Sequence, residues 1–241
     1  HYIYEYELAS FVIMLALLLH IRSQRQVATR PLRFFLYFLV TALAEAGLNV
    51  VASVAINAGT STPRLFIDGV NLTFFIVEAL CRLFFFLYIC ALCGVHRKTS
   101  PIAFFTGVIP AILLLLFILS NPWTHFIYHL DSHNAYILGP YASVEFASYC
   151  YYLILTFAVA YYYRDRLQMR HIYIIAEFTL LSIIAVIIEY LYRPLLLTSS
   201  VNALVLLNIY GAMQDPKIYQ EMVTGFGNWR AFSMRIMQLI R

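Results

Sequence analysis

Charged residues are scarce in this chain of 241 residues: they make up 12% of it, whereas hydrophobic residues make up 62%. Soluble domains average about 25% charged and 45–50% apolar residues, so the composition excludes an ordinary soluble protein and indicates a membrane protein. The formal net charge of +4 comes from arginines beside apolar runs. We therefore expect contact with anionic membrane lipid and none with nucleic acid.

Several kinds of chemistry lack the residues that they require. The only lysines, Lys98 and Lys217, lie outside the apolar runs, which excludes a retinal Schiff base in the membrane. The four cysteines lie in or beside those runs, so no disulfide is expected in an external loop. The runs contain no GxSxG, HExxH or glycine-rich phosphate loop. We therefore assign no catalytic residue, no metal site and no cofactor to this segment.

The sequence does have seven apolar runs. A helix that crosses ~30 Å of hydrocarbon needs about 20 mostly apolar residues, or about 17 at the least. We interpret each run as one crossing, so the expected fold is an all-α membrane protein, a bundle of seven transmembrane helices. The runs cover residues 8–21, 32–57, 65–94, 101–119, 141–163, 171–192 and 197–213.

Basic residues alternate with these runs. The sequence has sixteen lysines and arginines. The connections after the second, fourth and sixth runs hold only two of them, Arg64 and Arg193, and Arg82 lies inside a run. The other thirteen follow the first, third, fifth or seventh run: Arg22, Arg25, Arg30, Arg33, Arg97, Lys98, Arg164, Arg166, Arg170, Lys217, Arg230, Arg235 and Arg241. Because basic residues concentrate in cytoplasmic connections, this pattern predicts an external N-terminus and a cytoplasmic C-terminus.

Ionisable side chains inside the runs are candidates for a site, since a charge at the bilayer centre costs about 2.5–3.5 kcal/mol. Glu78 and Arg82 lie four residues apart with the acid first, which favours an ion pair on one helix face. With neighbouring polar residues they predict a ligand cleft that opens outward between the second, third, sixth and seventh helices. The same residues also suit hydrogen bonds between helices, and both interpretations stay open. The ligand-binding candidates are Glu45, Asn49, Asp68, Asn71, Glu78, Arg82, Glu177, Glu189, Asn202 and Asn208.

The longest external connection, residues 120–140, has two short β-prone runs around a turn-rich centre. This pattern predicts a short β-hairpin that lies over the outer surface as a lid. The spacing of His125, His129 and His133 would suit a metal on a helix, but the turn residues favour an extended, solvated segment. The lid residues are Trp123, His125, His129, Asp131 and Tyr136.

Beyond the last run the composition changes. Residues 221–232 read Glu-Met-Val-Thr-Gly-Phe-Gly-Asn-Trp-Arg-Ala-Phe, a glycine turn followed by the start of an amphipathic helix. This segment resembles the opening of GGDEF domains, the diguanylate cyclases of bacteria, although Glu221 stands where Asp is usual and Trp229 where Arg is usual. The resemblance implies that Asn228 contacts the guanine base. It also implies that GTP and Mg are bound downstream of Arg241, so that this segment would not itself be catalytic.

The bundle and the stretch from Asn121 to Tyr141 are similar to the seven-helix sensor modules that precede GGDEF or histidine-kinase domains. The resemblance implies a bacterial inner membrane, a homodimer, and a full-length diguanylate cyclase. We expect a sensor domain at 1–214 and a connector with the first helix of a truncated GGDEF-like domain at 215–241. The expected function is binding of an external or membrane-dissolved small ligand that controls cyclic-di-GMP output. The alternative is a transporter or channel that uses the intramembrane carboxylates.

Overall fold

The computed structural model describes residues 3–23, 29–58, 62–95, 97–132, 134, 136–167, 169–192 and 195–213. The segment 215–241, which includes Asn228, lies outside these ranges, as does His133. Within them the chain forms seven α-helices and one small hairpin. The helices are α1 (Glu5–Ser23), α2 (Arg30–Asn57), α3 (Arg64–Leu92), α4 (Pro101–Thr124), α5 (Ser143–Tyr162), α6 (Met169–Leu191) and α7 (Thr198–Met213).

Six of these helices, α1 to α6, are long and apolar enough to cross a membrane. Length and composition therefore make the chain a multi-pass membrane protein. The seventh helix, α7, has 16 described residues, which corresponds to a length of about 24 Å. It runs beside α1 and α6, but it is shorter than a typical spanning helix.

Local sequence signals place the helix starts. The Thr29 hydroxyl accepts a hydrogen bond from the Leu32 amide at 3.4 Å and so caps α2, and Pro31 lies in its first turn. Pro101 likewise lies in the first turn of α4, which has no side-chain cap. These starts match the expected runs within one or two residues.

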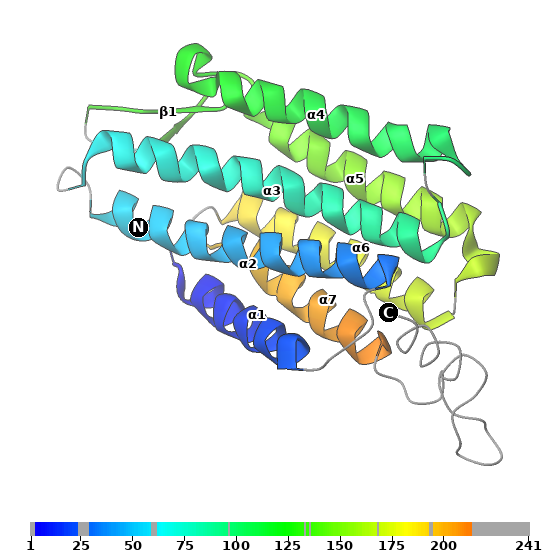
Figure 1. Cartoon of the computed structure of the whole chain (residues 1–241). Coiled ribbons are helices and arrows are strands. Elements are labelled where there is room, and N and C mark those ends of the chain that lie inside the picture. The colour runs from blue at the N-terminus through cyan, green and yellow to red at the C-terminus, as the bar shows by residue number, and fades with distance from the viewer. Residues whose placement is uncertain are drawn as a thin grey trace.

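Successive helices run in opposite directions, so their connections gather at two ends (Figure 1). One end carries the α2–α3 connection and the hairpin, and we call it the hairpin end. The other carries the α3–α4 and α5–α6 connections with most of the described basic residues, and we call it the arginine end. Arg166 ties these two connections together by donating to the Cys93 carbonyl at 3.2 Å.

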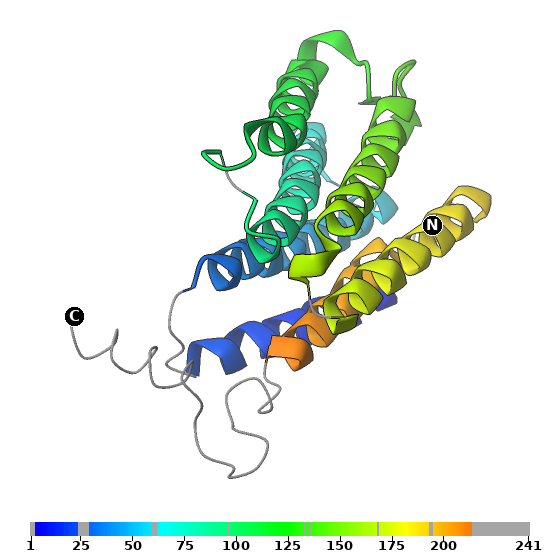
Figure 2. The same cartoon turned by 90° about the vertical axis from the view of Figure 1, so that its right-hand side faces the viewer.

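Helix α3 lies at the centre of the bundle and packs against α2, α4 and α5, while α7 packs between α1 and α6. Helices α5 and α6 meet near their connection and diverge toward the hairpin end (Figure 2). The main core lies in the arginine half and is rich in large aromatic side chains, including the fully buried Phe35, Phe38, Phe86 and Tyr88. The hairpin half has more room between its helices.

The expected hairpin is confirmed. Strands β1 (Tyr128–Leu130) and β2 (Tyr136–Leu138) pair antiparallel, with His129 opposite Ile137. Gly139 follows β2, and a Cβ atom there would lie 2.3 Å from the Phe126 carbonyl oxygen, so only glycine fits this close approach.

Candidate functional site

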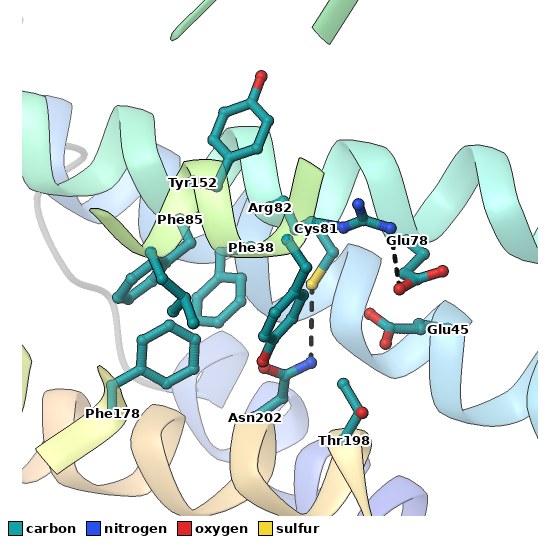
Figure 3. Close-up of a pocket in the computed structure, with 12 residues that line it drawn as sticks. Phe38, Glu45, Glu78, Cys81, Arg82, Phe85, Tyr152, Phe178, Thr198 and Asn202 are labelled. Atoms are coloured by element: carbon teal, nitrogen blue, oxygen red, sulfur yellow. Dashed lines mark hydrogen bonds and ion pairs between the residues drawn. The ribbon is translucent and has the colours of Figure 1, made fainter. Parts of the chain in front are cut away.

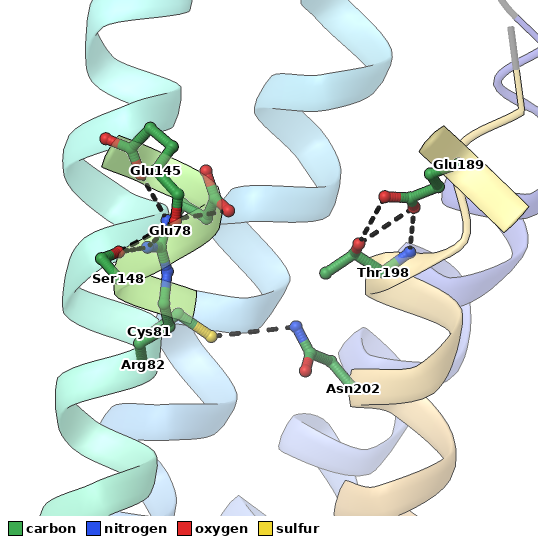
Figure 4. Close-up of polar contacts among 8 residues, drawn as sticks. All are labelled: Glu78, Cys81, Arg82, Glu145, Ser148, Glu189, Thr198 and Asn202. Carbon is green, nitrogen blue, oxygen red and sulfur yellow. Dashed lines mark hydrogen bonds and ion pairs between the residues drawn. The ribbon is translucent and has the colours of Figure 1, made fainter. Parts of the chain in front are cut away.

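Arg82 is the centre of a buried ion cluster between α3 and α5. Its Nη2 atom lies 2.8 Å from Glu78 Oε1 and 2.7 Å from Glu145 Oε2. Its Nη1 atom donates to the Ser148 hydroxyl and to the Glu145 carbonyl (Figure 4). One guanidinium therefore balances two carboxylates, which leaves the cluster with one excess negative charge when both acids are ionised.

Glu45 on α2 lies across from this cluster and is only 2% exposed. It takes no part in the three ion pairs found among the described residues. Its charge interacts with those of Glu78, Glu7 and Arg82, and the Cys81 thiol lies beside it. Asn202 of α7 reaches the same thiol, with 3.9 Å between Nδ2 and Sγ (Figure 3). The polar side chains of α2, α3 and α7 thus meet at one level of the bundle.

A cavity of about 380 Å³ extends from these groups to the hairpin. Helices α2, α3, α5 and α6, strand β2 and the start of α7 all contribute to its lining. A smaller pocket of about 30 Å³ shares Glu45, Glu78, Tyr149 and Thr198 with it and reaches deeper into the bundle. The polar lining residues are Glu45, Asn49, Ser53, Asn71, Glu78, Glu145, Glu189 and Thr198. The cavity has the size and the mixed lining of a small-molecule site.

The hairpin forms the roof of this cavity, and buried hydrogen bonds hold it in place. Asn121 of α4 is 2% exposed; its Oδ1 accepts from the Ile127 amide at 2.8 Å and its Nδ2 donates to the Tyr128 carbonyl at 3.2 Å. Arg64 donates to the Leu130 carbonyl at 2.9 Å. The roof is therefore fixed to α3 and α4.

An aromatic stack covers the inner side of the hairpin. The Tyr128 ring stacks between Phe75 and Tyr136, with ring centroids 5.5 Å and 5.3 Å apart. The Tyr128 hydroxyl donates to the Asp68 carbonyl at 2.9 Å. Burial raises the pKa of this phenol well above its usual value, and the nearby Asp68 charge adds to the effect. The hydroxyl therefore stays protonated and remains a donor at physiological pH.

Aromatic side chains also close the cavity toward the arginine end. Phe38, Phe85 and Phe178 line the deep pocket, and the ring centroid of Phe85 lies 4.3 Å from that of Phe178 and 5.1 Å from that of Phe38. We call these three rings the aromatic layer. Below it, the large buried side chains are mainly apolar.

Glu189 of α6 lies at the rim of the cavity and caps the start of α7. Its Oε1 accepts hydrogen bonds from the Thr198 amide at 2.8 Å and from the Thr198 hydroxyl at 2.9 Å (Figure 4). A carboxylate at a helix N-terminus is stabilised both by the free amides and by the helix dipole. The charge of Glu189 is therefore satisfied where it stands.

A second, larger groove of about 1030 Å³ runs between the diverging ends of α5 and α6. It shares Tyr136, Phe146, Val186 and Glu189 with the cavity, and most of its lining is apolar. The groove lies at the hairpin end, where Ser143 begins α5 and Leu191 ends α6, and the shared residues connect it with the cavity.

Most of the candidates proposed from the sequence come together, but three do not. Glu45, Asn49, Asn71, Glu78, Arg82, Glu189 and Asn202 line the cavity or its deep pocket. Asp68 instead lies beside Arg64 at the exposed helix end, with 3.8 Å between the charged atoms. Glu177 accepts hydrogen bonds from Asn208 at 3.1 Å and 3.2 Å on the exterior of α6 and α7.

The lid residues differ in their positions. Tyr136 lines the cavity, whereas Trp123 is 82% exposed at the end of α4. His125 ends α4 in the left-handed conformation, with φ at 53°, and its ring centroid lies 6.1 Å from that of His129. Among the described residues, no three His, Cys, Asp or Glu side chains, Asp131 included, gather closely enough to hold a metal.

Two acids, one largely and one fully buried, were not among the sequence candidates. Glu145 is in the first turn of α5, where an acid ordinarily serves the helix end. Glu7 of α1 is fully buried beside Asn49 and Ser199, and neither carboxylate oxygen has a hydrogen bond of normal geometry within the described chain. A helix-face plot would have marked Glu7, because it shares a face with the buried Ser10, Met14 and Ile21.

Comparisons with known protein families, with curated proteins and with solved structures find no match to this chain, so its function is argued from its own residues.

Proposed function

We propose that this chain is the sensory membrane domain of a bacterial signalling protein. It crosses the inner membrane seven times, with the hairpin end outside and the arginine end in the cytoplasm. A small ligand binds in the cavity beneath the hairpin and controls a cytoplasmic GGDEF-type domain that forms cyclic-di-GMP. The resemblance of residues 221–232 to such domains supports this output and a homodimeric assembly.

The observation that carries the proposal is the cavity of about 380 Å³ with its buried ionic groups. Thr198 and Asn202 of α7 are among the residues that line it or its deep pocket. Helix α7 is the last described helix before the segment that resembles the output domain. A ligand in the cavity therefore contacts the helix that leads to that domain. If the ligand binds one of two arrangements of α7 more tightly, it shifts the equilibrium toward that arrangement.

The aromatic layer favours sensing over the alternative of transport. A proton or ion relay needs polar groups along the whole path through the membrane. Here Phe38, Phe85 and Phe178 close the deep pocket on the arginine side. Among the described residues, the carboxylates of the cavity therefore do not continue as a polar path beyond the aromatic layer.

Filling the cavity tests the proposal. Ser53 lines the cavity and is 3% exposed, whereas its neighbour Val54 is 46% exposed on the exterior. In the full-length protein, Ser53→Trp is expected to change cyclic-di-GMP formation from GTP and Mg²⁺ by about fivefold or more, since coupling energies of 1–3 kcal/mol are typical. Val54→Trp is the matched control and is expected to leave output near the parent level. Equal output from folded Ser53→Trp and parent protein would contradict the proposal.

The proposed orientation has its own test. A cysteine at the exposed hairpin position Ser132 should react with a membrane-impermeant maleimide added to intact spheroplasts. A cysteine at the exposed Lys98 should react only after the membrane is opened. The native cysteines Cys81, Cys90 and Cys93 are buried, and a Cys150→Ser background removes the partly buried fourth one. The reverse labelling pattern would place the arginine end outside and reject the topology.

A further inference from the structure

The charges that face the cavity do not balance. Glu45, Glu78, Glu145 and Glu189 all line it, and Arg82 is the one described base beside them. Arg82 is already engaged by Glu78 and Glu145 at 2.8 Å and 2.7 Å. Glu189 is satisfied at the start of α7. The unbalanced charge therefore belongs to Glu45 and to the Glu78–Arg82–Glu145 cluster beside it.

Glu45 is an acid of the cavity wall that has no ion pair among the described residues. It is 2% exposed, it lines both the cavity and the deep pocket, and it forms none of the described ion pairs. Beside it lie a thiol and a second carboxylate, and the nearby Arg82 charge is already shared by Glu78 and Glu145. Glu7, one helix away and fully buried, adds another carboxylate without an ionic partner among the described residues. A buried carboxyl either keeps a proton or pairs with a positive group, and a cationic ligand would supply that positive group here.

The remaining walls suit an organic cation. Phe74, Phe75, Phe146 and Tyr149 line the cavity around the acids. The Tyr149 ring already has the Arg82 guanidinium over its face, at 5.9 Å from the centroid. Aromatic faces attract ammonium groups in the same manner. Since the described residues offer no metal-binding group of three or more ligands, the geometry does not suit a bare metal ion.

The groove between α5 and α6 indicates what the cation carries. It is mostly apolar, and it continues from the cavity through Phe146 and Val186. A molecule with its charged end at Glu45 would extend its other end into this groove. That end must be apolar to lie there.

From these observations we infer that the ligand of the cavity is an amphipathic amine, whose ammonium binds between Glu45 and Glu78 and whose apolar part lies in the α5–α6 groove. This inference rests on the proposed function, because it names the class of ligand for the same site. The ammonium supplies up to three N–H donors to the two carboxylates and gives Glu45 the ionic partner it lacks.

The test uses the full-length protein in phosphatidylglycerol nanodiscs and three probes of one shape. The probes are 4-phenylbutylamine, 4-phenylbutanol and 4-phenylbutyrate, and calorimetry measures their binding. The amine is expected to bind about tenfold more tightly than the alcohol, and the carboxylate more weakly still. A second set of nanodiscs replaces part of the phosphatidylglycerol with phosphatidylethanolamine, whose headgroup carries an ammonium. Weaker apparent binding of the amine in these nanodiscs would support the ammonium site and identify the lipid headgroup as the natural source of the ammonium.

Two variants and one control tie the binding to the site. Glu45→Gln is expected to abolish the preference of the protein for the amine over the alcohol. Asn49→Lys places a tethered ammonium one turn from Glu45, in the favourable order for an internal ion pair, and should give a folded protein that no longer binds the amine. Glu177→Gln removes a membrane-embedded carboxylate outside the cavity and should leave the preference unchanged.

Equal binding of amine and alcohol, or no binding of the amine, would overturn the assignment of a cation. An amine preference that survives in Glu45→Gln would overturn it as well. The proposed function would still stand in these cases if Ser53→Trp altered the output, so the two failures can be told apart.

Discussion

Replacing Arg82 with glutamine is expected to remove most of the folded protein. The side chain is 6% exposed and compensates Glu78 and Glu145 together. Removing one partner of a buried ionic cluster costs about 3–5 kcal/mol, because the remaining charges stay buried without compensation. Unfolding in mixed micelles, followed by circular dichroism, measures the loss.

The control is Asp68→Asn, which breaks the Arg64–Asp68 pair of the same i,i+4 spacing and leaves the hydrogen bond from Arg64 to the Leu130 carbonyl in place. The side chains of this pair are 55% and 40% exposed, so the expected loss is about 1 kcal/mol or less. A triple variant, Arg82→Met with Glu78→Gln and Glu145→Gln, removes all three charges and should recover most of the stability. If the triple variant were as unstable as Arg82→Gln, the loss would come from packing and the role assigned to charge would be wrong.

Replacing Gly107 with alanine is the second change with a large expected effect. Gly107 is buried in α4, and a Cβ atom there would lie 2.0 Å from the Phe86 ring of α3. The Gly107 carbonyl also accepts a hydrogen bond from the Tyr152 hydroxyl of α5 at 2.6 Å, so three helices meet at this position. Forcing α3 and α4 apart should cost about 1–3 kcal/mol for alanine, and more for valine.

Gly69→Ala is the control for this substitution, because a Cβ atom there meets no other atom within 4 Å. Alanine has the higher helix propensity, so this change should be neutral or stabilise the protein by up to about 1 kcal/mol. Adding Phe86→Leu to Gly107→Ala should restore part of the loss, since the two positions are in contact. If the losses of stability in the double variant were additive, the absence of a side chain at Gly107 would not be what makes room for the Phe86 ring.

The features that the sequence predicted are those set by local spacing. The Glu78–Arg82 ion pair was predicted from the spacing of four residues along one helix, and the structure confirms it. The hairpin follows from two β-prone runs around turn residues, and its strands pair as expected. The boundaries of the helices follow from apolar length and from residues such as Pro31 and Pro101.

What the sequence did not predict depends on contacts between helices. Glu145 completes the Arg82 cluster from another helix, 63 residues along the chain, and nothing local marks that contact. Glu177 is a different case, because it lies twelve residues from Glu189 on α6. At 100° per residue they point about 120° apart, so they could not both face one cavity. The aromatic layer likewise joins α2, α3 and α6, and packing alone determines it.

The aromatic layer also decides where an electrical potential across the membrane would fall. Phe38, Phe85 and Phe178 pack closely below the cavity. If water and ions fill the cavity from the hairpin end, as the proposed topology implies, the voltage drops mainly across the packed half. A unit charge that crosses the whole membrane experiences about 2.3 kcal/mol per 100 mV, but a cation that stops at Glu45 crosses little of that field. Its occupancy would follow its concentration and hardly respond to how strongly the membrane is energised.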